Sequence, residues 1–161
     1  MKPELKIVAI SRLRLLVLIS ALLLGGCGSS EPEQIVAEFV TQTEEAIEAR
    51  KGRAVRALIS ESYLDEQNRT KADLAGVATG YLLSNRSIYV LSRISEVIPI
   101  DEKTIQATVL AAFTGSPVGD AAGLPDINAD IYWFDITILE EDGDWKLSRA
   151  GWRQAMVEDF W

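Results

Sequence analysis

The side chains that could carry out chemistry are few in this chain, and the most versatile of them is missing. The sequence contains no histidine and a single cysteine, Cys27. Without histidine, Ser-His-Asp and Cys-His catalysis are excluded, and the most common zinc ligand is absent. The acidic segment 141–144 lacks the ligand spacing of a calcium loop. The sequence therefore predicts no metal site, and no cofactor-binding motif is visible.

Carboxylates and phenols remain as candidates for proton transfer. An isomerase-type site needs a carboxylate base beside a neutral acid or a tyrosine, and the sequence offers Asp130, Asp135, Tyr81 and Tyr132. Asp135 alternates with apolar residues along a predicted strand and shares its polar side with Thr137, so we expect it to face water. No recognisable catalytic motif joins these residues. We predict a non-catalytic protein, with no catalytic residue assigned.

The N-terminal segment has the layout of a secretion signal. Residues 1–14 carry four basic residues and one acidic residue, and residues 15–24 form an apolar run in which only Ser20 is polar. The run is too short to cross a bilayer as a helix, which takes about 20 residues. A charged start, an apolar stretch and small residues before a cleavage point are typical of a signal peptide.

The end of this segment, Leu24-Gly25-Gly26-Cys27, resembles the lipobox of bacterial lipoproteins. The resemblance implies that the sulfur of Cys27 receives a diacylglyceryl group and that the peptide is cut between Gly26 and Cys27. The new amino group would then be acylated, with palmitate as a typical chain. The alternative is an ordinary signal peptide with a chance cysteine. Several acyl chains would hold the protein at a membrane, where one chain binds only marginally.

These features predict that the chain has three parts and that it is located in the cell envelope. We expect a lipoprotein signal peptide at 1–26, a lipidated tether at 27–32 and one folded domain at 33–161. The protein would be anchored in the cell envelope through the lipid on Cys27. With glycine at position 28, the chain resembles lipoproteins that are transferred by default to the outer membrane. In a Gram-negative cell the domain would therefore lie at the periplasmic face of that membrane.

The charge of the chain is unevenly distributed. The first 26 residues carry a net charge of +3, so the remainder of a chain with −8 in total carries −11. An acidic domain is repelled by phosphates, which disfavours nucleic-acid binding and close contact with anionic lipid headgroups. An acidic surface also keeps a protein soluble.

The apolar periodicity changes once along the domain. Spacings of three and four residues predict helices first, and alternation of apolar and polar residues predicts strands afterwards. The predicted helices are 32–51, 54–64 and 72–83, and the predicted strands are 88–98, 104–113, 130–140 and 145–153. We expect a turn at 99–103, a long loop at 114–128, an Asp-Gly hairpin turn at 141–144 and a bulge near Arg149. This order indicates an α+β domain with helices on one face of an antiparallel sheet.

Helices followed by a meander that closes on EEDGDWKLSRAGW make the domain similar to the nuclear transport factor 2-like superfamily, which includes ketosteroid isomerase and polyketide cyclases. The resemblance covers roughly residues 33–154 and implies a cone with a pocket at its wide end. It implies a pocket lined by aromatic residues, of which the best candidates are Tyr63, Tyr81, Tyr132, Phe134 and Trp152. The alternative is that these aromatics form ordinary core.

The role of the domain follows less directly from the sequence. We expect a membrane-anchored binding or assembly module of the envelope; the alternative is a small-molecule-binding protein, or an isomerase- or cyclase-like enzyme, that uses the cone. Ile131, Trp133 and Leu139 form an apolar set on an otherwise polar strand face, which suggests a homodimer or an envelope protein partner. The alternative is that the 114–128 loop covers this face.

Overall fold

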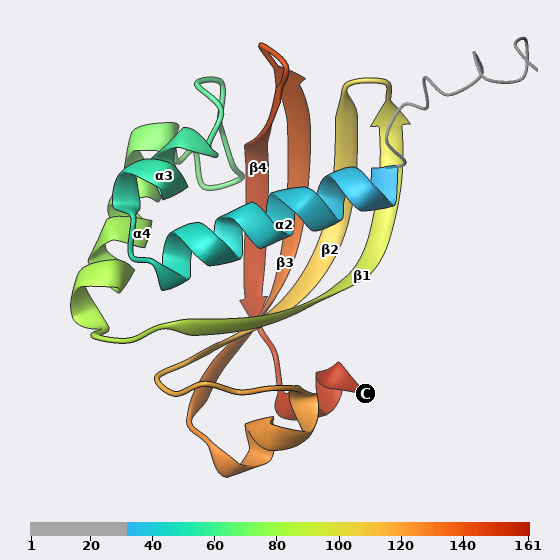
Figure 1. Ribbon diagram of the computed structural model, residues 1–161. Helices are drawn as coiled ribbons and strands as arrows, with labels where there is room; N and C mark the ends of the chain where they lie inside the picture. The colour runs from blue at the N-terminus through green and yellow to red at the C-terminus, as the bar shows by residue number, and fades with distance from the viewer. Residues whose placement is uncertain (1–31) are drawn as a thin grey trace, which may run out of the picture. The chain divides into compact units, whose positions relative to one another are not determined.

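The computed structural model describes residues 32–161, apart from the side chain of Asp126. The expected signal peptide, its cleavage point and Cys27 lie outside the described residues. Within residues 32–161, no helix combines the length and the hydrophobicity needed to span a membrane. Figure 1 shows the helices first in the chain and the strands after them, with α2 lying across the sheet.

Two of the three predicted helices form as expected. α2 spans Pro32–Glu48 and buries Val36 and Phe39 in the core on the sheet, and Ala46 in a smaller cluster with Val55 and Leu82, which confirms the period read from the sequence. The chain leaves the helix after Glu48, and Arg50 then adopts a positive φ of 55°, so that Lys51 N–H donates to the carbonyl of Ala46. α4 spans Lys71–Ser84.

The second predicted helix is shorter than expected. α3 spans only Gly52–Ala57, whereas the sequence predicted a helix over 54–64. After Leu58 the chain leaves the helix and Ile59 forms a parallel bridge with Leu147 of the last strand: Leu147 N–H donates to Leu58 O, and Ser60 N–H donates to Leu147 O. Leu64 N–H then donates to Ser148 O. α3 stops because residues 58–64 form hydrogen bonds with backbone groups at the edge of the sheet that would otherwise be unpaired.

The four predicted strands form one antiparallel sheet in the order β1-β2-β3-β4. The strands are β1 Tyr89–Asp101, β2 Thr104–Thr114, β3 Ala129–Glu141 and β4 Asp144–Gln154. The predicted turn at 99–103 is narrower, since β1 continues to Asp101. Between β3 and β4, Asp142 and Gly143 have φ of 57° and 86°, as a two-residue hairpin turn requires. The bulge also forms, because Thr137 pairs with Arg149 but Ile138 pairs with Leu147.

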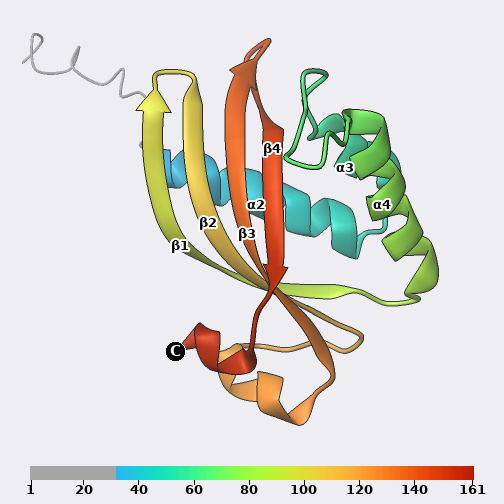
Figure 2. The same ribbon diagram turned by 180° about the vertical axis from the view of Figure 1, so that it is seen from behind.

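The two faces of the sheet are covered differently. The inner face packs under the helices, and its core includes Phe39, Ile105, Val109, Ile136 and Ile138. At one end of the outer face lies a second core, formed by Leu110, Ala112, Leu124, Ile131 and Phe160. Figure 2 shows that the two short 3-10 helices, η1 (Ala121–Asp126) and η2 (Val157–Phe160), lie together there.

This second core includes two members of the apolar set on β3, Ile131 and Trp133. Ile131 is buried, and Trp133 is half-buried against the loop and the C-terminal turn. Arg153 lies over the ring of Trp133, with its guanidinium carbon 5.3 Å from the ring centroid. The chain itself thus covers the end of the face that carries Ile131 and Trp133.

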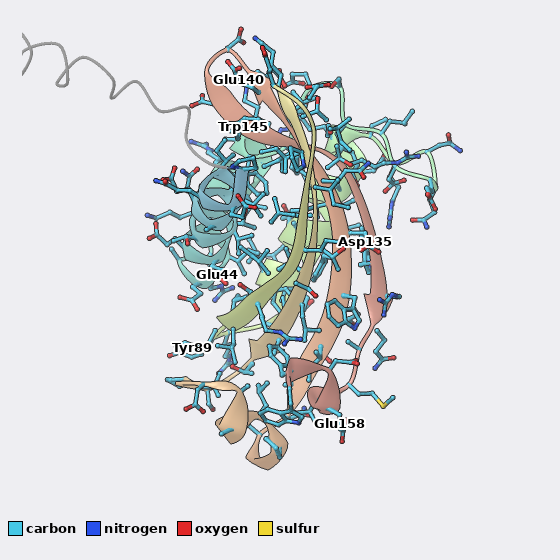
Figure 3. All side chains as sticks on the ribbon, turned by 90° about the vertical axis from the view of Figure 1, so that its right-hand side faces the viewer. Glu44, Tyr89, Asp135, Glu140, Trp145 and Glu158 are labelled. Atoms are coloured by element: carbon cyan, nitrogen blue, oxygen red, sulfur yellow. The ribbon has the colours of Figure 1, made fainter. Side chains whose placement is uncertain are left out.

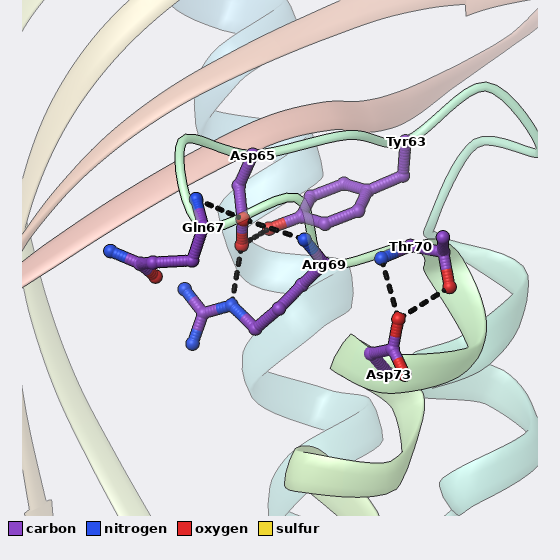
Figure 4. Close-up of polar contacts among 6 residues, drawn as sticks. All are labelled: Tyr63, Asp65, Gln67, Arg69, Thr70 and Asp73. Carbon is purple, nitrogen blue, oxygen red and sulfur yellow. Dashed lines mark hydrogen bonds and ion pairs between the residues drawn. The ribbon is translucent and has the colours of Figure 1, made fainter.

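A buried carboxylate ties the connection between α3 and α4 into the fold. Asp65 is only 4% exposed. Its Oδ1 accepts from the backbone N–H groups of Gln67 and Arg69 at 2.9 and 3.0 Å, and its Oδ2 accepts from Arg69 Nε at 2.6 Å and the Tyr63 hydroxyl at 3.1 Å (Figure 4). Asp73 then receives two hydrogen bonds from Thr70, at the start of α4.

These contacts shift the pKa values of both titratable partners. Burial alone would raise the pKa of Asp65, but the hydrogen bonds from Arg69 and Gln67 together lower it below its ordinary value of 3.8. Burial, helped by the hydrogen bond to Asp65, raises the pKa of Tyr63 to about 12. The network is therefore built around an ionised Asp65 and a protonated Tyr63 at neutral pH.

We predict that Asp65→Asn destabilises the protein at pH 7. The stabilisation from a lowered pKa is complete above the ordinary value of 3.8 and is lost as the pH falls through the lower folded value. The difference in unfolding free energy between wild type and variant should therefore shrink in acid. Urea unfolding from pH 7 down to pH of about 3 measures it. Glu66→Gln, the same charge change at an exposed neighbour, is the control; an equal loss there would contradict the prediction.

A second prediction concerns the C-terminal turn. Phe160 is 6% exposed and Trp161 is 65% exposed. Removing a buried aromatic ring costs about 3 kcal/mol of unfolding free energy, whereas an exposed substitution costs less than about 0.5 kcal/mol. Phe160→Ala should thus lower the urea midpoint markedly and Trp161→Ala hardly at all. Equal effects would show that the turn does not pack as described.

Candidate functional site

A cavity of about 380 Å³ lies between the helices and the inner face of the sheet. Small-molecule pockets have volumes of roughly 300–1,000 Å³, so a small ligand fits. All three α-helices and all four strands of the described domain contribute to its wall. The lining is mostly aliphatic and aromatic, and its ionisable side chains are Glu44, Tyr81 and Tyr132.

Small side chains leave this space open. Ala78 on α4, Ala111 on β2 and Ala150 on β4 all line the cavity. The last two are 5% and 6% exposed and lie on the inner face of the sheet. An alanine at such a position supplies backbone and one methyl group but does not fill the volume above it.

Aromatic rings form a continuous wall across the sheet. The ring centroids of Tyr81 and Phe113 are 5.6 Å apart, and those of Phe113 and Tyr132 are 6.4 Å apart, both edge to face. Phe134 continues the series to Trp152 at 6.5 Å. These distances are those of favourable aromatic pairs, so the wall is fixed by contacts among its own members.

The predicted pocket residues are distributed as follows. Tyr81, Tyr132, Phe134 and Trp152 line the cavity, and Tyr63 does not. Tyr63 is 3% exposed and directs its hydroxyl to Asp65. Its position in the irregular segment after α3, instead of a helix, takes it away from the cavity.

The Asp65 network nevertheless reaches the cavity wall through Arg69. The guanidinium carbon of Arg69 lies 4.0 Å from the ring centroid of Trp152, within the range of a cation–π contact. Arg69 is held in turn by its ion pair with Asp65. The network therefore positions Trp152 without any of its carboxylates entering the cavity.

Glu44 is the functional candidate that sequence reasoning missed. It is half-buried and lines the cavity from α2. Burial raises the pKa of Glu44, a hydrogen bond with Ser92 lowers it, and repulsion from Glu48 raises it again, with a net increase above 4.5. A signal was present in the sequence, because position 44 is four residues after Val40 and three before Ile47, on the apolar stripe of the helix.

The two aspartates proposed from the sequence are placed elsewhere. Asp135 is exposed on the outer face, where its Oδ1 accepts from Thr108 Oγ1 at 2.9 Å. Figure 3 shows Glu44 and Asp135 on opposite sides of the sheet. Asp130 is exposed at the start of β3; burial, followed by the charge of Asp130, raises the pKa of Tyr81. Tyr81 is therefore a protonated hydrogen-bond donor at neutral pH.

The arrangement has the properties of a binding site for a small apolar molecule. Its wall provides apolar contact, a carboxylate and two phenol groups. Within residues 32–161, no three cysteine, aspartate or glutamate residues are placed together to hold a metal ion.

Comparisons with known proteins identify the fold. No protein-family model and no curated protein sequence matches the chain. Solved structures do match. A scytalone dehydratase-like protein from Novosphingobium aromaticivorans has a TM-score of 0.59 at 14% identity, over 77% of this chain and 84% of that one. A ketosteroid isomerase-like protein from Erwinia carotovora atroseptica has a TM-score of 0.58 at 13% identity, over 80% and 99%.

A third similar structure is Aln2 from Streptomyces, with a TM-score of 0.60 at 12% identity, over 79% of this chain and 93% of that one. At such identities the likeness establishes how the backbone is arranged and leaves activity aside. Helices packed on a curved antiparallel sheet are what these structures and this chain share. The described domain therefore has the nuclear transport factor 2-like fold.

Proposed function

We propose that the domain binds a small, predominantly apolar molecule in the cavity between α2, α4 and the sheet. The observation that supports this most directly is the cavity itself, about 380 Å³ of open volume with an apolar lining. A core that only had to be stable would close on such a space, because each unfilled volume costs stability. Binding in the cone is also compatible with the names of the similar structures, which include enzyme-like members.

The proposal selects the small-molecule alternative of the sequence analysis over an assembly module. A carboxylate beside an open cavity favours this alternative, and Glu44 lines the cavity. We keep the envelope address as part of the proposal: the tether at 27–32 would hold a ligand-binding domain close to a membrane, where apolar molecules concentrate. Recovery of an N-terminal peptide that begins with lipid-modified Cys27 from the membrane fraction would test the address, and a retained Met1 would contradict it.

A catalytic version of the proposal has one specific observation in its favour. The raised pKa of Glu44 moves a carboxylate toward the range of a general base, and Tyr81 and Tyr132 line the same cavity as potential acids. Proton transfer, however, would need an acid placed across the substrate from Glu44, whereas binding needs only the cavity. We therefore propose binding as the function.

We predict that filling the cavity abolishes ligand binding. The probe is N-phenylnaphthylamine, a neutral fluorophore whose emission rises in apolar surroundings. At about 0.3 kcal/mol per heavy atom, its roughly 17 atoms give a dissociation constant on the order of 0.1 mM. Ala78→Phe should weaken binding by about tenfold or more, because a ring would occupy the volume beside α4.

The matched control is Ala72→Phe, which adds the same ring to an exposed position of the same helix. It should leave the dissociation constant within about twofold of wild type. Circular dichroism and the urea midpoint check that both variants are folded. Unchanged binding in a folded Ala78→Phe variant would exclude the cavity as the site.

A further inference from the structure

One wall of the cavity differs chemically from the others. Glu44 is a carboxylate among mainly apolar neighbours, and it is half-buried. It therefore lies where the cavity meets solvent. Ser92 on β1 and Thr43 on α2 are the other polar side chains beside it in the lining. A ligand with its apolar body in the cavity would present its polar end here.

The carboxylate of Glu44 has no positive partner within the described domain. The ion pairs among residues 32–161 involve Asp65, Glu61, Glu140 and Glu141, and none includes Glu44. Ser92 lowers the pKa of Glu44 but carries no charge. A partly desolvated carboxylate without a counter-charge gains strongly from a cation brought to it.

The helix that carries Glu44 increases this preference. α2 contains five glutamates and no lysine or arginine, and its last turn has no basic residue. Glu44 is four residues from its C-terminal end, where the helix dipole is negative. Glu48 adds a further negative charge nearby, as its effect on Glu44 shows. The field at this wall therefore favours a cation and opposes an anion.

We infer that the molecule bound in the cavity is a cationic amphiphile: an apolar body carrying a protonated amine, which pairs with Glu44 at the wall formed by α2 and β1. The inference rests on the proposed function, since it names the chemical class of ligand for the same cavity. Tyr81 and Tyr132, on the aromatic wall, contact the apolar body and play no part in binding the charge. Glu44 thus determines specificity for the head group.

Three probes of one shape test this inference. Aminoadamantane, adamantanol and adamantane carboxylate share a rigid apolar cage and differ in head-group charge. Titration calorimetry on the purified protein at pH 7 should give the tightest binding for the amine. A partly exposed ion pair contributes about 1 kcal/mol, so the amine should bind about fivefold more tightly than the alcohol, and the carboxylate more weakly than the alcohol.

The variants identify the residue responsible. Glu44→Gln should bring the amine and the alcohol within about twofold of each other while alcohol binding is retained. The control is Glu45→Gln, which removes the same charge from an exposed position on the same helix; it should preserve most of the preference for the amine. Loss of the preference in both variants would show a general field effect and overturn the role of Glu44.

Two other results would overturn the inference. One is equal binding of amine and alcohol to the wild type, and the other is failure of the amine to bind a cavity that does bind the neutral fluorophore. Failure of the proposed function has a different signature: the fluorophore binds Ala78→Phe and wild type alike. The two hypotheses can therefore fail separately.

Discussion

The alternation of side chains along β2 and β3 is the constraint on which the domain depends. Their register is uninterrupted from Thr104 paired with Leu139 to Thr114 paired with Ala129, so every second residue faces the helices over the full length of both strands. A shift by one residue would exchange the core and the solvent face. The same alternation places Ala111 among Phe113, Tyr132 and Phe134, and the cavity exists because small and large inner-face residues share one surface.

The second structural requirement is the edge of β4. An unpaired strand edge exposes backbone groups, and residues 58–64 occupy part of it with hydrogen bonds to Leu147 and Ser148. The Asp65 network follows directly and holds Arg69 over Trp152. Protection of the edge and positioning of the cavity wall thus depend on the same short segment. A helix through residue 64 would have satisfied its own backbone hydrogen bonds. It would not have protected the edge of β4, and it would not have positioned Arg69 over Trp152.

Charge is distributed unevenly around the cavity. Its aromatic wall is neutral, whereas α2 contributes the carboxylate of Glu44 to the lining close to the negative end of the helix dipole, on a helix whose other four glutamates are exposed. The acidic character of the domain, which from composition alone favours solubility, thus has a local consequence at one wall. The proposals made above depend on this asymmetry: apolar volume for the body of a ligand and a carboxylate without a counter-charge for its head group.

The elements whose geometry is local could be predicted from the sequence. The spacing of apolar residues predicted α2, α4 and the four strands. The pair Asp142-Gly143 predicted the hairpin turn, because both residues adopt positive φ. The sequence also indicated four aromatics of the cavity wall. The end of α3 at Ala57 and the turn of Tyr63 toward Asp65 depend on contacts with β4 and the segment after α3, since pairing with β4 competes with helix formation across a long sequence separation. The tertiary structure likewise decided that Glu44 faces open volume, because an unfilled space between α2 and β1 belongs to the packing of distant segments and has no pattern in the chain.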